Sequence, residues 1–579
     1  MKGFESFSLS LLDYMVFLSY FAIILFIGLW AGRKKKTDSS GYFLAGRTLP
    51  WYVVGSSFIA ANISSEHFIG MIGASFVYGL CMAQYCWGNI FSFSLLVWFF
   101  IPFLLSARIF TTPEFLEKRF NPALRQFFAI VTIISNVIAF LAAVLYGGGI
   151  ALEKLFGWDL WIGIAAIGFL AGIITLWGGL MSVAWADVFT VLVMFAGGIL
   201  VTVLGLYMLS GDSHSLLEGW KIMVERNQAH TGVWAEAVAQ NAQNILHRDT
   251  YNRMSVIQPI THDITPWLGL LLGVFSISIW YNVINQFMIQ RVLGAKNMYH
   301  ARMGIVLAGY MQILLPIIIV IPGLILFAQY PEVLKKPWAE IRPEADKGYV
   351  HMLQTVIPLG LRGLFLAALF GAIQSTIQSV LNSTATIATL DIYKRMIKPD
   401  ASEKHTVAVG RWTTGIVLLI AMVLAGYIQK FGGGLFVYIQ TLYAFFAPPF
   451  AAVFLLGILF RRINGPGAST AVFSGFAFGI LMKVYVQFVP DHPAWLEPYL
   501  MQAIINWAFC VIVCAVVSLS TAPPRPEQIT DQLTFNWKKM NIFTELGRKW
   551  YSHVLLWWGL FAAVIIILMV VFSGLFFKA

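Results

Sequence analysis

The sequence predicts an all-α polytopic membrane protein with about 14 transmembrane helices, each formed by one long apolar run. Hydrophobic residues make up 59% of the 579 residues and charged residues only 11%, whereas a soluble protein carries about 25% charged residues. Apolar runs of roughly 20 residues, the length that crosses a bilayer, follow one another along the chain. The stretches between them leave no soluble domain of ordinary size.

The first span is expected to be a transmembrane helix rather than a cleaved signal, because it is long enough to cross and leads into the basic run Arg33 to Lys36. Each later span is justified by the same length rule. The expected spans lie near residues 11–31, 50–77, 81–105, 125–150, 159–178, 185–209, 266–289, 303–328, 353–387, 408–428, 434–458, 467–488, 499–520 and 551–577.

The distribution of positive charge predicts the topology. A net charge of +11 could indicate nucleic-acid binding, but lysine and arginine also collect in the cytoplasmic loops of membrane proteins. When the N-terminus is placed outside, most lysines and arginines fall on the inner side. We therefore expect a multi-pass protein of the cell (plasma) membrane, with both termini outside, in contact with the lipid bilayer and without a nucleic-acid partner.

The four cysteines do not point to a metal site or a disulfide framework. All of them, Cys81, Cys86, Cys510 and Cys514, fall in apolar stretches without metal-type loop spacing. Cys81, Cys510 and Cys514 are interpreted as packing residues, the usual role of a buried free cysteine.

Polar residues interrupt two of the predicted spans. In span 50–77 the run from Asn62 to His67 carries amide, hydroxyl, carboxyl and imidazole groups, and in span 266–289 the interruption runs from Ser276 to Gln286. Polar groups are costly in hydrocarbon and persist mainly where they line a cavity or bind something. Transporters often form their site where interrupted helices of two inverted repeats meet. These interruptions fall in the second and seventh spans, so each would open one repeat.

This interpretation divides the chain into five parts. Residues 1–49 form a leading helix and a basic inner loop, and residues 211–265 form an outer loop. Residues 50–210 form the first repeat, with spans two to six, and residues 266–458 form the second, with spans seven to eleven. Residues 459–579 form three trailing helices with an inner linker, 521–550.

Span nine carries a third polar face. Ser375, Gln378 and Ser379 are spaced i, i+3, i+4 and therefore share one side of a helix. Hydroxyls beside an unwound helix supply the hard oxygen ligands that a small cation prefers. The alternative is that they bond to carbonyls of their own helix or allow close helix packing.

Several motifs along the chain match one family in order and spacing, and together they cover nearly the whole sequence. They are Ala60-Ala61-Asn62-Ile63-Ser64, Thr112 to Phe120, Gly178-Gly179-Leu180, Trp185 to Val188, Asn285-Gln286 with Gln290-Arg291, and Leu381 to Thr386 with Asp391 to Lys394. On these residues the chain resembles the sodium/solute symporter family, and its sodium/sugar cotransporter branch most closely.

The resemblance implies a fold and a coupling ion. The fold is the LeuT-type 5+5 inverted repeat, here with one leading and three trailing helices, and the ion is Na⁺, with no other cofactor. The sodium ligands carried over by motif are Ala60, Ile63, Ala372, Ser375 and Thr376. A second sodium site found in some members corresponds to Asp187 and Ser379, although Gln378 stands where another serine would be. Asp187 could instead be a solvated residue at the inner end of its helix.

The resemblance also implies a solute site and gates. The solute-binding positions correspond to His67, Cys86, Asn89, Ser278, Tyr281, Asn282, Gln312 and Gln440, and the gates to Met71, Tyr85, Phe436, Tyr281 and Asn62. Sugar-transporting members have Glu at Cys86, Lys at Gln312 and Trp at Asn282. Loss of both the acid and the base leaves the pocket near neutral, so a sugar, a polyol and a sugar acid are all open as solutes.

The function expected from these features is sodium-coupled symport of a small polyhydroxylated solute by alternating access. Proton coupling through Glu66, His67 or Asp187 is the alternative mechanism, and a membrane sensor or channel on the same scaffold is an alternative of another class. An enzyme is not expected, because Glu66 and His67 are adjacent and point about 100° apart on a helix, and no HExxH or GxSxG motif is present.

Overall fold

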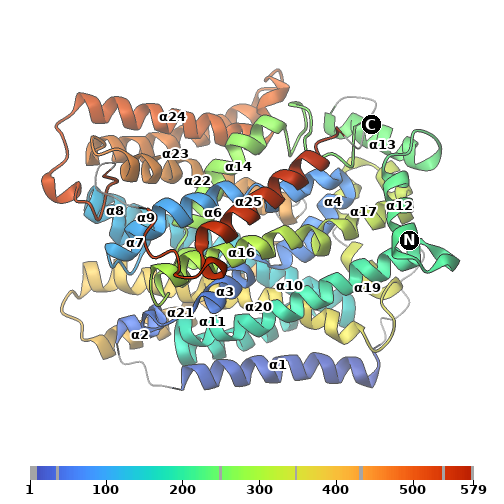
Figure 1. Ribbon diagram of the computed structural model, residues 1–579, viewed down its shortest axis with the longest axis horizontal. Helices are drawn as coiled ribbons and strands as arrows, with labels where there is room; N and C mark the ends of the chain where they lie inside the picture. The colour runs from blue at the N-terminus through green and yellow to red at the C-terminus, as the bar shows by residue number, and fades with distance from the viewer. Residues whose placement is uncertain are drawn as a thin grey trace.

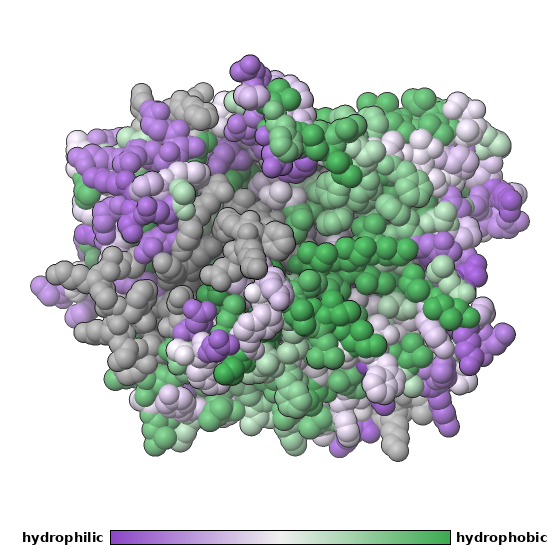
Figure 2. Space-filling view, turned by 180° about the vertical axis from the view of Figure 1, so that it is seen from behind, coloured by the Kyte–Doolittle hydropathy of each residue, from purple (hydrophilic) through white to green (hydrophobic). Residues whose placement is uncertain are grey.

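The computed structural model describes residues 9–33, 38–246, 251–345, 348–428, 435–536 and 542–575. Within these ranges the regular structure is helical, apart from two isolated β-bridges, Leu49–Ala295 and Gln258–Pro266. Most of the long helices run along a common direction, as Figure 1 shows. Hydrophobic side chains cover much of the middle of the surface in Figure 2, and hydrophilic ones gather toward its ends, as expected of a lipid-facing belt.

The helices of the first part of the chain are α1 (Leu11–Gly32), α2 (Ser39–Phe43), α3 (Trp51–Asn62), α4 (Ile72–Tyr78), α5 (Gln84–Trp87), α6 (Ile90–Leu95), α7 (Ile101–Ser106), α8 (Thr112–Arg119), α9 (Pro122–Ser135), α10 (Ala142–Phe156) and α11 (Leu160–Leu209). The middle part contains α12 (Leu216–Asn227), α13 (Gly232–Leu246), α14 (Val274–Ser278), α15 (Gln286–Leu293), α16 (Met298–Ile319), α17 (Ile321–Gln329), α18 (Trp338–Ala345), α19 (Gly348–Thr355) and α20 (Arg362–Ile387). The last part contains α21 (Glu403–Ala425), α22 (Leu435–Leu459), α23 (Gly465–Phe488), α24 (Tyr499–Ser520) and α25 (Val554–Val571).

Eleven helices in the described ranges are long and apolar enough to cross a membrane, or up to twelve if a bent pair is one span. The sequence predicts about 14, and one difference lies in α11. The predicted spans 159–178 and 185–209 form this single 50-residue element, whose backbone turns at Gly179 (φ 56°, ψ −144°). A straight helix of that length would extend about 75 Å, well beyond the ~30 Å hydrocarbon core. A side chain does not fit at the turn, because a Cβ on Gly179 would lie 2.3 Å from the Tyr42 carbonyl oxygen.

Two other predicted spans also differ from the structure. Span 50–77 is divided between α3 and α4, and neither helix is long enough by itself to cross the membrane. Span 353–387 begins later, at Arg362, because Pro358 and the left-handed Gly360 (φ 94°) separate α19 from α20. The carboxylate of Asp13 in α1 accepts hydrogen bonds from the backbone N–H of Gly360 (3.0 Å) and of Gly363 (2.8 Å), which fixes the start of α20 against α1.

Both predicted interruptions are present. Helix α3 ends at Asn62, Ile63 is extended (φ −86°, ψ 123°), and a π-helical turn at Glu66–Met71 leads into α4. In the seventh predicted span, the π-helical turn Ile279–Ile284 ends at the extended Asn285, and α15 departs at 48°. Each break exposes backbone carbonyls within an apolar environment, where they need polar partners.

The C-terminal end of α4 is fixed by a buried arginine. The last carbonyls of a helix have no partner within the helix, and here the Arg253 guanidinium donates to the carbonyls of Phe76 (2.6 Å) and Val77 (2.8 Å). The same guanidinium lies 3.8 Å from the Phe327 ring centroid in α17. The loop that follows α13 therefore holds the second half of the interrupted span.

Helix α25 packs against α16, the helix that comes after α15 in the chain. Tyr310 of α16 donates to the Trp557 carbonyl of α25 at 2.8 Å, and a Cβ on Gly309 would lie 2.8 Å from the Phe561 ring. Just beyond α25, the Phe572 carbonyl accepts from the Val256 amide at 2.7 Å. The end of α25 and the loop 251–265 thus lie at the same end of the molecule, near α13 in Figure 1.

We predict that Gly179→Ala lowers the apparent melting temperature of the purified protein. The φ, ψ values of Gly179 lie in a region that costs a residue with a Cβ about 1–3 kcal/mol, and the added methyl group would also contact the Tyr42 carbonyl. Gly415→Ala is the matched control, because a Cβ on Gly415 has no heavy atom within 4 Å. Equal melting temperatures for the two variants would contradict this account of the bend.

Candidate functional site

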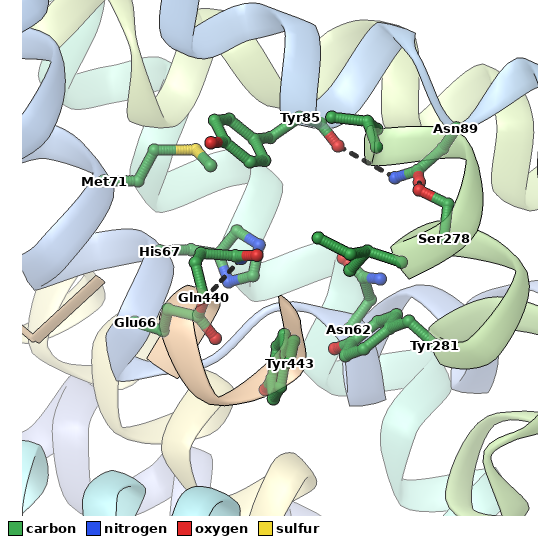
Figure 3. A pocket seen from close by; sticks show the side chains of 12 residues that line it. Asn62, Glu66, His67, Met71, Tyr85, Asn89, Ser278, Tyr281, Gln440 and Tyr443 are labelled. Atoms are coloured by element: carbon green, nitrogen blue, oxygen red, sulfur yellow. Dashed lines mark hydrogen bonds between the residues drawn. The ribbon is translucent and has the colours of Figure 1, made fainter. Parts of the chain in front are cut away.

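A cavity of about 50 Å³ lies beside both breaks (Figure 3). Residues from the α3–α4 break, from α5 and its C-terminal turn, from the span before α15, and from α22 surround it. They are Asn62, Glu66, His67, Met71, Tyr85, Asn89, Val274, Ile277, Ser278, Tyr281, Gln440 and Tyr443. This space holds only a few water molecules, so a sugar-sized guest requires some of these side chains to move.

One end of the cavity holds a carboxylate and an amide. Glu66 is almost fully buried, with 4% of its surface exposed, and its Oε1 accepts a hydrogen bond from Gln440 Nε2 at 3.0 Å. His67, the next residue, accepts from the Ser64 backbone N–H through Nδ1 at 3.4 Å. The π-helical turn that carries Glu66 and His67 brings both side chains to the cavity lining.

A cluster of amides and hydroxyls forms the opposite end. The Asn89 Oδ1 accepts from the Ser278 hydroxyl (2.9 Å) and from Asn282 Nδ2 (3.0 Å). Asn89 Nδ2 donates to the Tyr85 carbonyl at 2.9 Å, and Asn282 also donates to the Ser92 hydroxyl at 3.0 Å. Asn282 therefore lies behind Asn89 and holds it in place.

Aromatic rings close two sides of the cavity. Tyr281 and Tyr443 lie 5.6 Å apart between ring centroids, and both stack on Phe140, at 6.1 and 4.8 Å. On another side, Met71 and Tyr85 face the space in Figure 3, and the Tyr85 hydroxyl bonds the Tyr499 hydroxyl. Tyrosine rings offer the apolar faces that a polyhydroxylated ring can cover.

The carbonyls freed by the first break meet the hydroxyls of α20. Thr376 Oγ1 donates to the carbonyl of Ile63 at 3.1 Å and approaches that of Ala61 at 3.4 Å. Ser375, Ala60 and Ala372 are fully buried in the same region of the two helices. A carbonyl oxygen has a second lone pair, so this arrangement can supply oxygen ligands to a small cation.

A buried ionic network adjoins these hydroxyls. Asp187 of α11 accepts from Ser375 (2.6 Å) and from Ser57 of α3 (2.5 Å), and its Oδ2 lies 3.9 Å from Arg291 Nη2. The Arg291 guanidinium, on α15, also donates to the Ser57 hydroxyl (2.8 Å) and to the Ser379 hydroxyl of α20. Asp187 and Ser379, which correspond to a second sodium site in some members of the resembled family, here both contact the Arg291 guanidinium.

The structure brings most of the predicted solute and gate residues together. Asn62, His67, Met71, Tyr85, Asn89, Ser278, Tyr281 and Gln440 all line the cavity. Among the described side chains, Cys86, Asn282 and Gln312 do not line it, although all three are buried. The side chain of Phe436 lies outside the described residues.

Four lining residues, Glu66, Val274, Ile277 and Tyr443, are not among the predicted solute and gate residues. Glu66 lies in the polar interruption of the second span and is given as a proton carrier, but the sequence pattern assigns no role to Val274, Ile277 or Tyr443. Tyr443 could have been found, because it follows Gln440 by three residues and so shares its helix face. Arg291 appears in the sequence analysis only as part of a motif. Its position in the sequence gives no sign that it pairs with Asp187.

Comparisons with known proteins find one matching family model, similar sequences and a similar fold. A model of the sodium:solute symporter family matches residues 42–475. The chain is 34% identical over 550 residues to a sodium/glucose cotransporter of Vibrio parahaemolyticus, covering 92% of this chain and 96% of that one. It is 29% identical over 562 residues to a human sodium/myo-inositol cotransporter, and the match covers 92% of this chain and 76% of that one. The solved structure of a Na⁺-coupled sialic acid symporter, in a substrate-bound outward-open state, has a similar fold, with a TM-score of 0.69. The two sequences are 22% identical, and the match covers 89% of this chain and 99% of that one.

We predict that Arg291→Met strongly destabilises the protein. It leaves the Asp187 carboxylate buried without its cation, and breaking such a pair from one side costs about 3–5 kcal/mol. The double variant Asp187→Asn with Arg291→Met should recover part of the loss, because it removes both charges. Thermal melting monitored by size-exclusion chromatography compares the three proteins. A double variant no more stable than Arg291→Met would contradict the pairing.

Proposed function

This chain belongs to the sodium:solute symporter family, and we propose that it imports a small polyhydroxylated solute together with Na⁺ by alternating access. Na⁺ is the coupling ion of the family, and the relatives are symporters rather than enzymes. The names of the sugar and inositol relatives support a polyhydroxylated solute. So does a cavity that combines three tyrosines with amides, a hydroxyl and a carboxylate, because each solute hydroxyl must regain the contacts that it lost with water.

The observation that carries this proposal is the contact between Thr376 and the Ile63 carbonyl at 3.1 Å. We propose that Na⁺ binds between the α3 break and α20, with the carbonyls of Ala60, Ile63 and Ala372 and the hydroxyls of Ser375 and Thr376 as ligands. These are hard oxygen atoms of the kind that such cations prefer. A cation there would hold the broken helix against α20, with the solute cavity beside the same break. Solute affinity should then rise with Na⁺, and Na⁺ affinity with solute, by linkage.

We propose a single sodium ion in this site. Asp187 and Ser379, the counterparts of a second site, both contact Arg291. A guanidinium there already supplies the positive charge that a second Na⁺ would bring, and Gln378 replaces a hydroxyl with an amide. Sodium activation of uptake should therefore be hyperbolic rather than sigmoidal.

We also propose the membrane arrangement in full. Eleven long helices, the bent pair at Asn285 as one further span, α3 with α4 as another, and a second crossing within α11 give 14 spans in the described ranges. Residues 1–49 form the leading helix and its inner loop. Residues 50–210 and 266–458 form the two inverted repeats, with the outer loop 211–265 between them. Residues 459–579 form the trailing helices, which include the inner linker 521–550. The close contact of α3 with α15, through Ser57 and Arg291, supports pairing of the two broken helices. Both termini would lie outside the plasma membrane, on the side of α12 and α13.

Proton coupling is the second candidate, and the buried carboxyls Glu66 and Asp187 favour it. Uptake of labelled solute into proteoliposomes distinguishes the two. We expect uptake to require Na⁺ and to stop when Na⁺ is replaced by choline or K⁺ at constant pH. Equal uptake in choline, driven instead by an inward proton gradient, would contradict sodium coupling.

We predict that Thr376→Val raises the Na⁺ concentration for half-maximal uptake about tenfold or more, equivalent to roughly 1.4 kcal/mol, because it replaces an oxygen ligand with a methyl group of similar size. Ser375→Ala should act in the same direction. Thr414→Val is the matched control, because the Thr414 hydroxyl on α21 contacts the Gly410 carbonyl of its own helix and the Tyr42 hydroxyl, and none of the proposed sodium ligands. Unchanged Na⁺ activation in Thr376→Val would remove this site assignment.

A further inference from the structure

A wide groove lies at the end of the molecule where the proposed topology places the cytoplasm. Its volume is about 1110 Å³, and it lies among the turn before α3, the C-terminal end of α7, the loop between α15 and α16, and part of the linker before α25. In Figure 1, α7 and α8 lie at the end opposite α12 and α13, the helices on the proposed outer side. The proposed symport of Na⁺ and solute gives this groove no role.

Hydrogen bonds hold the walls of the groove together. The Lys296 amide donates to the Leu49 carbonyl at 3.0 Å, which joins the loop before α16 to the turn before α3. The Arg47 guanidinium donates to the carbonyls of Arg108 (3.2 Å) and Ile109 (2.9 Å), which follow α7. The three basic residues therefore come together through contacts of the fold itself.

The lining of the groove is mainly basic. Arg47, Arg108 and Lys296 all line it, together with the carboxylate of Glu545. Within the part of the chain that the structure describes, neither Arg108 nor Lys296 forms an ion pair. Partial burial and the nearby charge of Arg108 lower the pKa of Arg47. Like charges held close together repel one another, so a bound anion would stabilise this arrangement.

An adjoining cavity, which shares one lining residue with the groove, shows the contrast. Its Arg125 lies 2.6 Å from a Glu117 oxygen and 2.7 Å from an Asp391 oxygen. Its Lys394 lies 2.7 Å from a Glu403 oxygen. These cations are neutralised by carboxylates of the protein itself, whereas two of the three in the groove are not.

Unusual backbone conformations also gather at the groove. In the described ranges five residues other than glycine have a positive φ, and three of them, Arg47 (54°), Arg108 (47°) and Glu545 (53°), line the groove. A left-handed conformation is unfavourable for a residue with a Cβ, and such residues cluster at functional sites. Two of the three lining cations are therefore held in place at an energetic cost.

We propose that this groove binds the phosphate headgroup of an anionic phospholipid from the inner leaflet. Arginine and lysine recognise phosphate, and a guanidinium can bind two of its oxygens at once. Leu105, Phe110 and Met298 add apolar surface to the lining, which suits a lipid better than a free phosphate ion. On the proposed orientation the groove faces the cytoplasmic leaflet, which carries the negatively charged lipids. A bound headgroup would hold the segments around α3, α7 and α16 together and stabilise the protein.

Thermal stabilisation of the purified protein in detergent, at constant ionic strength, tests this proposal. The probes are dioctanoyl phosphatidylglycerol, dioctanoyl phosphatidylcholine and inorganic phosphate, and the half-saturating concentration of each is recorded. We expect phosphatidylglycerol to act at a concentration at least tenfold lower than phosphatidylcholine, because basic residues attract anionic lipids. Arg108→Gln with Lys296→Gln should reduce that preference at least fivefold. Both side chains are exposed, so the double variant should still fold.

Lys398→Gln with Lys404→Gln is the matched control. It removes the same charge from two exposed lysines between α20 and α21 that do not line the groove, and it should leave the preference unchanged. An equal loss in both double variants would show diffuse attraction to a basic face and overturn the proposal.

The unaltered protein gives two further decisive outcomes. Equal half-saturating concentrations for the two phospholipids would overturn the proposal. Inorganic phosphate acting at as low a concentration as phosphatidylglycerol would assign the groove to a soluble anion and overturn a lipid site. None of these measurements uses a transported solute or a Na⁺ gradient, so their outcome is independent of the proposed symport.

Discussion

A backbone that unwinds inside a membrane must find partners for its polar groups. Hydrocarbon offers none, so the carbonyls freed after Asn62 are satisfied by side chains, by an ion or by a guest. In this protein the Thr376 hydroxyl reaches the Ile63 carbonyl from α20, and the cavity opens beside the same break. The proposed ion site and the proposed solute cavity both lie where this requirement is met.

A buried guanidinium, that of Arg291, links the helix after the second break to the helix before the first. Arg291 on α15 contacts Ser57 on α3, Asp187 on α11 and Ser379 on α20, so four helices share one guanidinium. Asp187 in turn bonds Ser375, one of the proposed sodium ligands. The proposed ion site is therefore joined by one hydrogen bond to the contacts that hold α15 against α11 and α20. This provides a physical route by which Na⁺ binding can bias the position of both broken helices.

The apolar spans and their two interruptions could be predicted from the sequence, because they are visible as patterns, and most of the lining residues were implied by the resemblance to a known family. The orientation of particular side chains could not be predicted. The π-helical turns at Glu66–Met71 and Ile279–Ile284 change the angle between successive residues. Ideal helical spacing therefore fails to predict that Glu66 lines the cavity while Asn282 lies behind Asn89. The turn at Gly179 was equally hidden, since a glycine between two apolar runs looks the same whether the helix ends or bends there.

Hydrogen–deuterium exchange across residues 58–68 tests the central claim most directly, because it reports whether a cation holds the unwound backbone. The purified protein is compared in NaCl and in KCl at equal ionic strength, with the α12 segment as the internal reference. Sodium should slow exchange in this stretch at least several-fold, and Thr376→Val should abolish the effect. Exchange in this segment that is the same in both salts would contradict a sodium ion bound between the broken helix and α20.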